Sequence, residues 1–305
     1  MASWGELLVE LIPHKDTNGK DAPILSHDQL RNKYLQALSA HTGRNVIAYY
    51  SGWLKDSRAP FLDITDNDMT GFMQCLQGID CKKGLDLILH TPGGNPTAAE
   101  GIVNYLHAKF NDDIRVIVPH MAMSAGTMLA CASKVILMGK HSCLGPIDPQ
   151  YNNVPAYNIR REYLEAKGDL DKNKASATYW KMQLDRYPCA FFYTVSDAIE
   201  LSWALTEEWL RKYMFKGLDQ GEINKRIRVI LSKLNNNNKS HSRHFGFDVC
   251  KGLGLNVEPL ESDNELQDLV LSVHHAFTIT FDQTNASKIV ENQLGSRYLN
   301  FRKGS

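Results

Sequence analysis

The sequence carries no net charge and no long apolar run. Lys and Arg together number 34, and Asp and Glu also number 34. Because there is no overall basic field, we expect neither a nucleic-acid partner nor attraction to an anionic membrane. No apolar stretch reaches the length of a bilayer span. The first residues, MASWGELLVELIPHKD, lack the basic region and continuous apolar core of a signal peptide. We therefore expect a cytoplasmic protein.

Motifs of common cofactor and metal sites are also missing. The sequence has neither the GxGxxG spacing of dinucleotide-binding turns nor the Walker lysine of phosphate-binding loops. His241 and His244 have a helical spacing, but no third metal ligand accompanies them, so we assign both to structural or surface roles. We expect no cofactor and no metal.

The cysteines include no CxxC pair, which disfavours zinc. In a reducing compartment they are expected to be buried thiols rather than disulfides. The six are Cys75, Cys81, Cys131, Cys143, Cys189 and Cys250.

Strand and helix patterns alternate in the first half of the chain. With 305 residues, 43% of them hydrophobic, the chain can form one large α/β domain with an appended part, or two modest domains. The alternation predicts βαβ units and a parallel sheet with right-handed crossovers. Strands are predicted at 45–51, 85–90, 114–119 and 134–139, and helices at 27–40, 66–76, 97–110 and about 124–133.

Helical patterns dominate from about residue 155 onward. Helices are predicted at 156–167, 173–187, 196–201, 206–214 and 221–234, a short strand at 255–260, and a long final helix at 263–288. We divide the chain into an N-terminal docking segment (1–44), a catalytic core (45–155) and a mainly helical part (156–305). The last part is expected to complete the core and to mediate assembly.

Two unusual turns follow successive predicted strands. Ligands of open α/β sheets bind outside the carboxyl ends of the strands, which is where Thr91-Pro92-Gly93-Gly94 and His120 to Gly126 lie. Glycines permit close approach to backbone amides, and Ser124 is placed at a helix start with free N–H groups. A hydroxyl nucleophile and an amide pair from Gly93 and Ala125 suit acyl transfer. Alternatively, Ser124 is an ordinary N-cap, and the glycines form an ordinary turn or a phosphate loop.

The segments LDLILHTPGGNPTAAEGIVNYL and IRVIVPHMAMSAGTMLACASKVILMGKHSCLGPIDPQ resemble the serine dehydrogenase proteinase family. This family lies in the Clp-protease/crotonase superfamily, beside signal peptide peptidase A, and the clear match covers about 85–155. The resemblance implies an α/β fold, a spiral of ββα units. It also implies that Ser124 is the nucleophile and that the amides of Gly93 and Ala125, with Gly94 nearby, form the oxyanion hole.

The resemblance leaves the general base open. The Clp proteolytic subunit has a histidine after the strand that follows the nucleophile helix, whereas this chain has Ile147 and Asp148 there. Asp148 could orient a base or act as one. Signal peptide peptidases use a lysine farther along, and burial can lower a lysine pKa enough for that task. The candidate lysines are Lys167, Lys172 and Lys174.

These features predict a serine peptidase that acts on peptide or protein substrates through an acyl-enzyme. Two alternatives are a crotonase-like acyl-CoA enzyme and a catalytically degenerate scaffold that binds peptides. Relatives form rings or stacked dimers, so the resemblance implies a homo-oligomer. Any use of ATP would belong to a separate ATPase partner, because this chain lacks a Walker motif.

Overall fold

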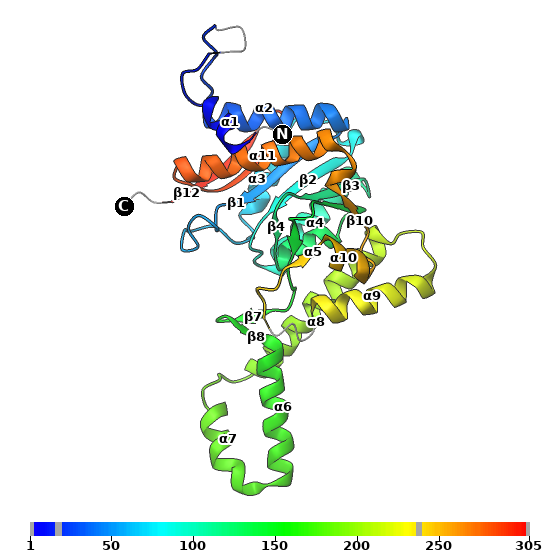
Figure 1. Ribbon diagram of the computed structural model, residues 1–305. Coiled ribbons are helices and arrows are strands. Elements are labelled where there is room, and N and C mark those ends of the chain that lie inside the picture. The colour runs from blue at the N-terminus through cyan, green and yellow to red at the C-terminus, as the bar shows by residue number, and fades with distance from the viewer. Residues whose placement is uncertain (1–2, 16–19, 236–239, 303–305) are drawn as a thin grey trace.

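A mixed α/β architecture surrounds one large sheet in the computed structural model, which describes residues 3–15, 20–235 and 240–302 (Figure 1). The strand order is β10-β5-β3-β2-β1-β11-β12. The strands from β10 to β1 are parallel, and β11 and β12 form an antiparallel hairpin at one edge. Their bounds, in sheet order, are Val257–Pro259, Val135–Met138, Ile114–Val118, Leu85–His90, Asn45–Ser51, Ala286–Asn292 and Arg297–Phe301.

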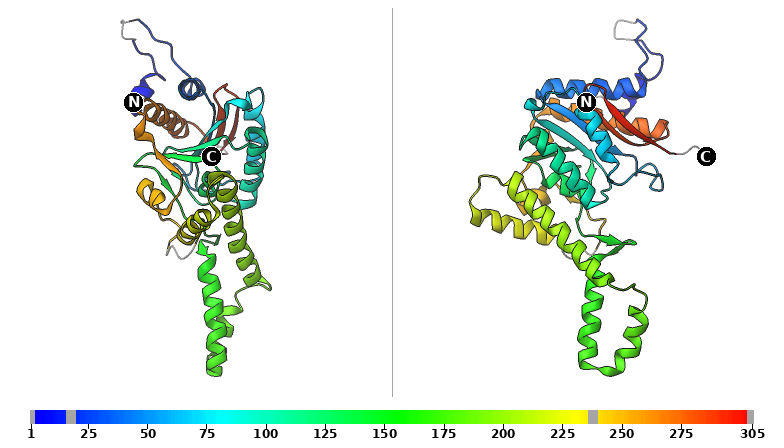
Figure 2. Two further views of the ribbon diagram at one scale, coloured as in Figure 1. Left: turned by 90° about the vertical axis from the view of Figure 1, so that its right-hand side faces the viewer. Right: turned by 180° about the vertical axis from the view of Figure 1, so that it is seen from behind.

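Helices cover both faces of this sheet, so its central strands are apolar on both sides. Strand β1 shows the alternation: Ile47 and Tyr49 enter one core cluster, whereas Ala48 and Tyr50 enter the other. The first face carries α3 (Asp68–Leu76), α4 (Pro96–Phe110) and α5 (Ala125–Cys131). The second carries α1 (Trp4–Val9), α2 (His27–Thr42) and α11 (Asn264–Gln283), as Figure 2 shows from the side.

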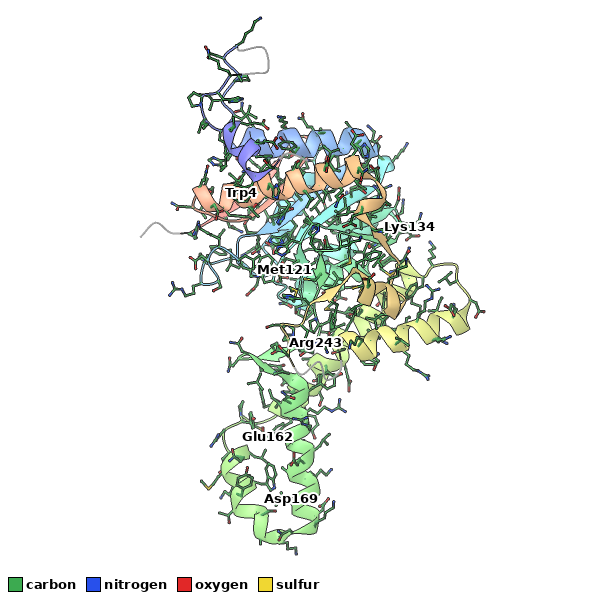
Figure 3. All side chains as sticks on the ribbon, in the orientation of Figure 1. Trp4, Met121, Lys134, Glu162, Asp169 and Arg243 are labelled. Carbon is green, nitrogen blue, oxygen red and sulfur yellow. The ribbon has the colours of Figure 1, made fainter. Side chains whose placement is uncertain are left out.

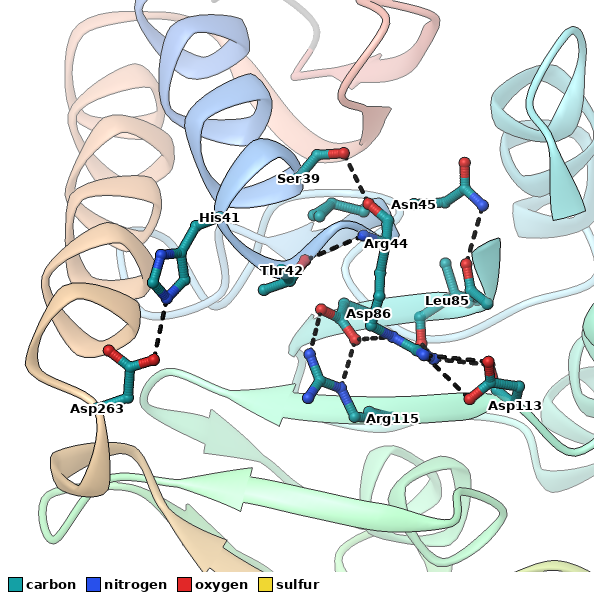
Figure 4. Close-up of polar contacts among 12 residues, drawn as sticks. Ser39, His41, Thr42, Arg44, Asn45, Leu85, Asp86, Asp113, Arg115 and Asp263 are labelled. Carbon is teal, nitrogen blue, oxygen red and sulfur yellow. Dashed lines mark hydrogen bonds and ion pairs between the residues drawn. The ribbon is translucent and has the colours of Figure 1, made fainter. Parts of the chain in front are cut away.

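An ion network joins the amino ends of β1, β2 and β3 (Figure 4). Asp86 on β2 is fully buried and accepts from Arg44 at 2.8 Å and from Arg115 at 2.7 Å. Arg44 also contacts Asp113 before β3. Removing the shared carboxylate would take from Arg115 its partner Asp86 and would leave Arg44 paired with Asp113 only. This network lies at the end of the strands opposite to the two unusual turns.

Short strands beyond the carboxyl ends form a second, smaller sheet. Its order is β4 (Met121–Ala122), β6 (Cys143–Leu144) and β9 (Phe245–Gly246). The chain then turns through a two-stranded hairpin, β7 (Gln150–Tyr151) and β8 (Val154–Pro155), into the helical region.

The helical region has two parts. Helix α6 (Ala156–Lys172), the 3-10 turn η2 (Lys174–Ser176) and α7 (Ala177–Leu184) form a hairpin that projects from the body (Figure 1). The other helices pack nearer the sheet. These are α8 (Phe191–Trp209), its π-helical extension η3 (Leu210–Met214), α9 (Gln220–Leu234) and α10 (Phe247–Leu253), and the 3-10 turn η4 (Leu260–Ser262) precedes α11.

The structure confirms the predicted strands of the first half and corrects two predictions in the second. The helices predicted at 196–201 and 206–214 belong to one continuous run, α8 with η3. The predicted final helix is too long: α11 ends at Gln283, and residues 286–292 form β11. The reason is non-local, because β11 pairs with β1, which lies early in the chain.

The buried-thiol prediction is correct for four cysteines and wrong for two. All six are free, but Cys189 is exposed and Cys81 is half-buried. Over residues 3–15, 20–235 and 240–302, no helix combines the length and apolar character needed to cross a membrane.

Candidate active site

The two unusual turns lie side by side beyond the carboxyl ends of β2 and β3. The Thr91 N–H donates to the Met121 carbonyl at 3.1 Å, and the Met123 N–H donates to the Thr91 carbonyl at 3.0 Å. A Cβ added to Gly93 would lie 2.5 Å from the Ser124 Cβ. Only glycine, which has no Cβ, leaves room for this approach. Ser124 therefore lies directly against the glycine turn.

Ser124 has a strained backbone. Its φ of 51° and ψ of −119° lie outside the regions that non-glycine residues commonly occupy. Such conformations persist only where the surroundings enforce them, and they concentrate at functional sites. The hydroxyl makes no capping hydrogen bond to α5, so Ser124 is not acting as the side-chain N-cap considered above.

The two glycines of the first turn differ in what their amides can do. The buried Gly93 N–H donates to the Thr91 hydroxyl at 3.1 Å. The Gly93 carbonyl accepts from the Ile64 N–H at 2.7 Å. Because a trans peptide directs its C=O and N–H oppositely, the Gly94 N–H points away from Ile64. Within the described part of the chain, neither this amide nor that of Ala125 donates a hydrogen bond to another protein group.

A cavity of about 660 Å³ opens beside these amides. Ser124, Gly94 and Ala125 are on its wall, and Met128, Ile147 and Leu201 supply apolar surface. Asp63, Gln150 and His241 add polar groups. Concave, mainly apolar pockets with a few converging polar groups are typical of substrate sites.

His241 reaches this cavity from a distant part of the chain. Its Nδ1 lies 3.1 Å from Asp148 Oδ1. The antiparallel pairing of β6 with β9 explains the meeting, because Leu144 pairs with Phe245. Continuing that register four residues past Leu144 places Asp148 opposite His241. The Asp148 side chain is only 6% exposed and that of His241 is 28% exposed.

Other side chains hold the loop that carries Asp148. Gln150 Nε2 donates to Asp148 Oδ2 at 2.8 Å. The Ser202 hydroxyl on α8 donates to the Ile147 carbonyl at 2.7 Å. The Thr127 hydroxyl lies 2.8 Å from the Ala122 carbonyl and accepts the Gly145 N–H at 2.9 Å. These bonds join α5, α8 and the Asp148 loop into one unit.

The candidate lysines do not line this cavity. Lys167 and Lys172 lie on α6, and Lys174 lies on η2. Figure 3 labels Glu162 and Asp169 on the projecting hairpin, and Lys167 lies between them in the sequence. Both labelled residues are well away from Met121, which lies in the turn that carries Ser124. The structure therefore brings Ser124, Gly94 and Ala125 to one cavity. Asp148 is joined to this cavity through His241, which lines it. The three lysines do not line it.

A second cavity, of about 260 Å³, lies beside three histidines on neighbouring elements. The ring centroids of His90, His120 and His274 are 5.1 to 5.7 Å apart. Burial lowers the pKa of all three, and that of His274 falls to about 3. In the described ranges, no group of three or more His, Cys, Asp or Glu is arranged to hold a metal ion.

His241 is the site residue that sequence reasoning missed. Its neighbour His244 suggested only a metal-type spacing, and the two-residue strand β9 was not predicted. The signal that could have found it is the Phe245-Gly246 pair, read as a short strand that pairs with the segment before Asp148. Such a short pairing has no usable periodicity in the sequence.

Two comparisons with known proteins bear on this site. Proteins of Methanocaldococcus jannaschii described as uncharacterized are 42% identical over 105 residues and 43% identical over 79 residues. These alignments cover 34% and 26% of this chain, and 36% and 27% of the relatives, so the chain spans about a third of their length. The family model for the ClpP-like SDH-type serine proteinase matches residues 31–178, which include both turns and Asp148. The model matches the family that the motifs of this stretch resemble.

Proposed function

We propose that the protein is a serine peptidase in which Ser124 is the nucleophile, His241 the general base and Asp148 the residue that orients the base. The observation that carries this proposal is one cavity lined by a strained, uncapped Ser124 and by an imidazole paired with a buried carboxylate. A nucleophile, a base and a group that orients the base are the three parts that acyl transfer needs.

The Asp148 contact sets the role of each imidazole nitrogen. An Nδ1–H donated to the carboxylate leaves Nε2 unprotonated. Nε2 takes the Ser124 proton as Oγ bonds to the carbonyl carbon of the substrate. No hydrogen bond joins the two side chains among the residues of this structure that are described, so the productive contact would form when substrate fills the cavity.

The tetrahedral intermediate then breaks its C–N bond. His241 gives the proton to the leaving amine, and Ser124 keeps the acyl group as an ester. A water molecule, deprotonated by His241, attacks this ester and releases the acid and free Ser124. In each half of the cycle His241 takes one proton and passes it on: from Ser124 to the leaving amine during acylation, and from water to the Ser124 oxygen during deacylation.

We assign the oxyanion donors to the amides of Gly94 and Ala125. The resemblance implied Gly93 and Ala125, but the Gly93 N–H already donates to Thr91. The Gly94 N–H is directed away from Ile64 and lies on the cavity wall. Removal of one such donor typically lowers kcat by about 10² to 10³.

The Asp148–His241 pair favours a peptidase over the two alternatives. An acyl-CoA enzyme that stabilises an enolate needs no nucleophilic serine, and a peptide-binding scaffold needs no base. The proposed spiral of ββα units has separate support. Strands β3 and β4 are followed by α5, and a bridge from Thr91 to Ala122 precedes α4.

A fluorophosphonate probe tests the assignment directly. We expect it to label the wild-type protein at Ser124, Ser124→Ala to abolish labelling, and His241→Gln to slow it strongly. His244→Gln is the matched control, because His244 is an exposed histidine three residues away that does not line the cavity. Equal labelling rates for His241→Gln and His244→Gln would remove His241 from the mechanism.

We also propose that the protein assembles as a homo-oligomer. The projecting hairpin exposes large apolar side chains, including Leu164 at 54% and Met182 at 67%. Light scattering of the full chain, compared with a Leu164→Asp/Met182→Asp variant, would test whether the hairpin mediates self-association. Whether a separate ATPase delivers substrate stays a prediction of the resemblance.

A further inference from the structure

A buried lysine outside the proposed triad lies close to the oxyanion turn. Lys288 on β11 is 1% exposed. Its ammonium donates to both Asp68 carboxylate oxygens, at 2.8 and 2.9 Å, and to the Asp63 carbonyl at 2.6 Å. All three N–H donors are therefore used, and Lys288 does not line the Ser124 cavity. It is not placed to act as the base.

Buried ion pairs contribute little net stability, because desolvation offsets most of their attraction. A role in fixing a specific geometry is the alternative to test. The partners of Asp68 show which geometry is concerned. Its carboxylate also accepts the Tyr49 hydroxyl at 2.9 Å and the Thr65 N–H at 2.9 Å.

Lys288 and Asp68 together hold both sides of Ile64. The ammonium holds the Asp63 carbonyl before it, and the carboxylate holds the Thr65 N–H after it. Ile64 then pairs with the glycine turn: its N–H donates to the Gly93 carbonyl at 2.7 Å, and its carbonyl accepts from the Asn95 N–H at 2.9 Å. A Cβ on Gly94 would lie 2.3 Å from the Ile64 nitrogen, so the two backbones are in tight contact.

We propose that Lys288 is a positioning residue for the oxyanion hole: through Asp68 it fixes Ile64, and Ile64 fixes the peptide plane that aims the Gly94 N–H into the cavity. This inference rests on the proposed role of that amide. It assigns a function to a strand that lies outside the family match, since β11 follows residue 178 by more than a hundred residues.

The test compares two buried cations that both involve β11: Lys288 lies on this strand, and Arg31 pairs with Glu291 on it. Lys288→Met removes the ammonium that holds Asp63 and Asp68. Arg31→Met is the matched control, because Arg31 is fully buried and contacts Glu291 on β11 at 2.6 Å, whereas no hydrogen bond or ion pair in the described part of the chain joins it to residues 63–65. A Lys288→Met/Asp68→Leu double variant removes both charges and so avoids an uncompensated buried carboxylate.

Two readouts separate positioning from stability. Amide hydrogen exchange follows the Ile64 and Asn95 N–H groups, and the fluorophosphonate labelling rate follows the oxyanion hole. For Lys288→Met and for the double variant we expect exchange at these two amides to quicken at least about tenfold. Labelling should slow by on the order of 10²-fold, as small misplacements do at active sites. Arg31→Met should leave both rates unchanged at temperatures where it is folded.

Unchanged exchange at Ile64 and Asn95 in the folded double variant would overturn the inference. Equal effects from Arg31→Met would overturn it too, because they would show a general loss of stability. If the wild-type protein is not labelled at all, the proposed peptidase function fails. The exchange comparison needs no catalysis, so it still decides whether Lys288 positions the turn.

Discussion

Replacing Asp148 with Asn tests the residue that is proposed to orient the general base. Asparagine keeps the size of the side chain but removes the charge that faces His241 Nδ1 at 3.1 Å. It also allows an amide N–H to face that nitrogen, which would favour the wrong imidazole tautomer. Ser124 and the amides of Gly94 and Ala125 are untouched by this change.

The structure sets the size of the expected effect. Two unit charges 3.1 Å apart attract by about 5 kcal/mol at an effective dielectric constant near 20. This is the stabilisation that the imidazolium gains in the transition state. The His241 side chain is 28% exposed, so solvent screens part of it, and about 3 to 4 kcal/mol remains. At about 1.4 kcal/mol per factor of ten, kcat should fall by about 10² to 10³.

The assay is single-turnover acylation with an activated ester or fluorogenic peptide, together with thermal unfolding of each variant. Asp63→Asn is the matched control, because Asp63 is another carboxylate on the wall of the same cavity, and over residues 3–15, 20–235 and 240–302 no hydrogen bond or ion pair joins it to His241. Acylation by Asp148→Asn within about threefold of wild type, while Ser124→Ala is inactive, would refute the proposed orienting role.

Three further predictions concern other parts of the molecule. The pKa of His274 in the folded state is lowered to about 3 by burial and by neighbouring histidines. At pH values below the ordinary pKa of histidine, the unfolded chain therefore binds more protons at this group than the folded protein does. Stability from this group is present above about pH 6.5 and decreases as the pH falls. Urea titrations should show a loss of up to about 2 kcal/mol from this group between pH 6.5 and 5. His274→Leu should lack this loss, and an equal loss in His274→Leu and wild type would contradict the lowered pKa. Asp86→Ala should reduce the free energy of unfolding by about 3 kcal/mol or more while the labelling rate of Ser124 in the folded protein stays unchanged; a large change in that rate would show coupling between the two ends of the sheet. Gly94→Ala should abolish labelling of Ser124, because the new Cβ would lie 2.3 Å from the Ile64 nitrogen. Gly78→Ala is the control, because Gly78 also has a positive φ, +80°, but has open space around it. It should lower the free energy of unfolding by only about 1 kcal/mol and keep full labelling. A labelled Gly94→Ala variant would disprove the tight contact with Ile64.

The sequence alone identified the strands that lead into the site and the turns that form its nucleophile side. The strand 85–90 was predicted with its observed bounds, because a short run of β-favouring apolar residues between turns is a local signal. The Pro-Gly-Gly turn and Ser124 were likewise visible, since both are continuous stretches whose residue types have direct conformational meaning. The family match over residues 31–178 agrees with these motifs.

Only the tertiary structure decided which groups meet Ser124. His241 reaches Asp148 through a two-residue strand pair. Lys288 reaches Asp63 and Asp68 from β11, whose first residues, 286–288, the sequence pattern had placed in a helix. Both depend on strands that pair with distant partners, and local propensity carries little information on such pairings. The sequence therefore determined the proposed nucleophile and the glycine turn, whereas long-range strand pairing determined the positions of the proposed base and of the buried lysine.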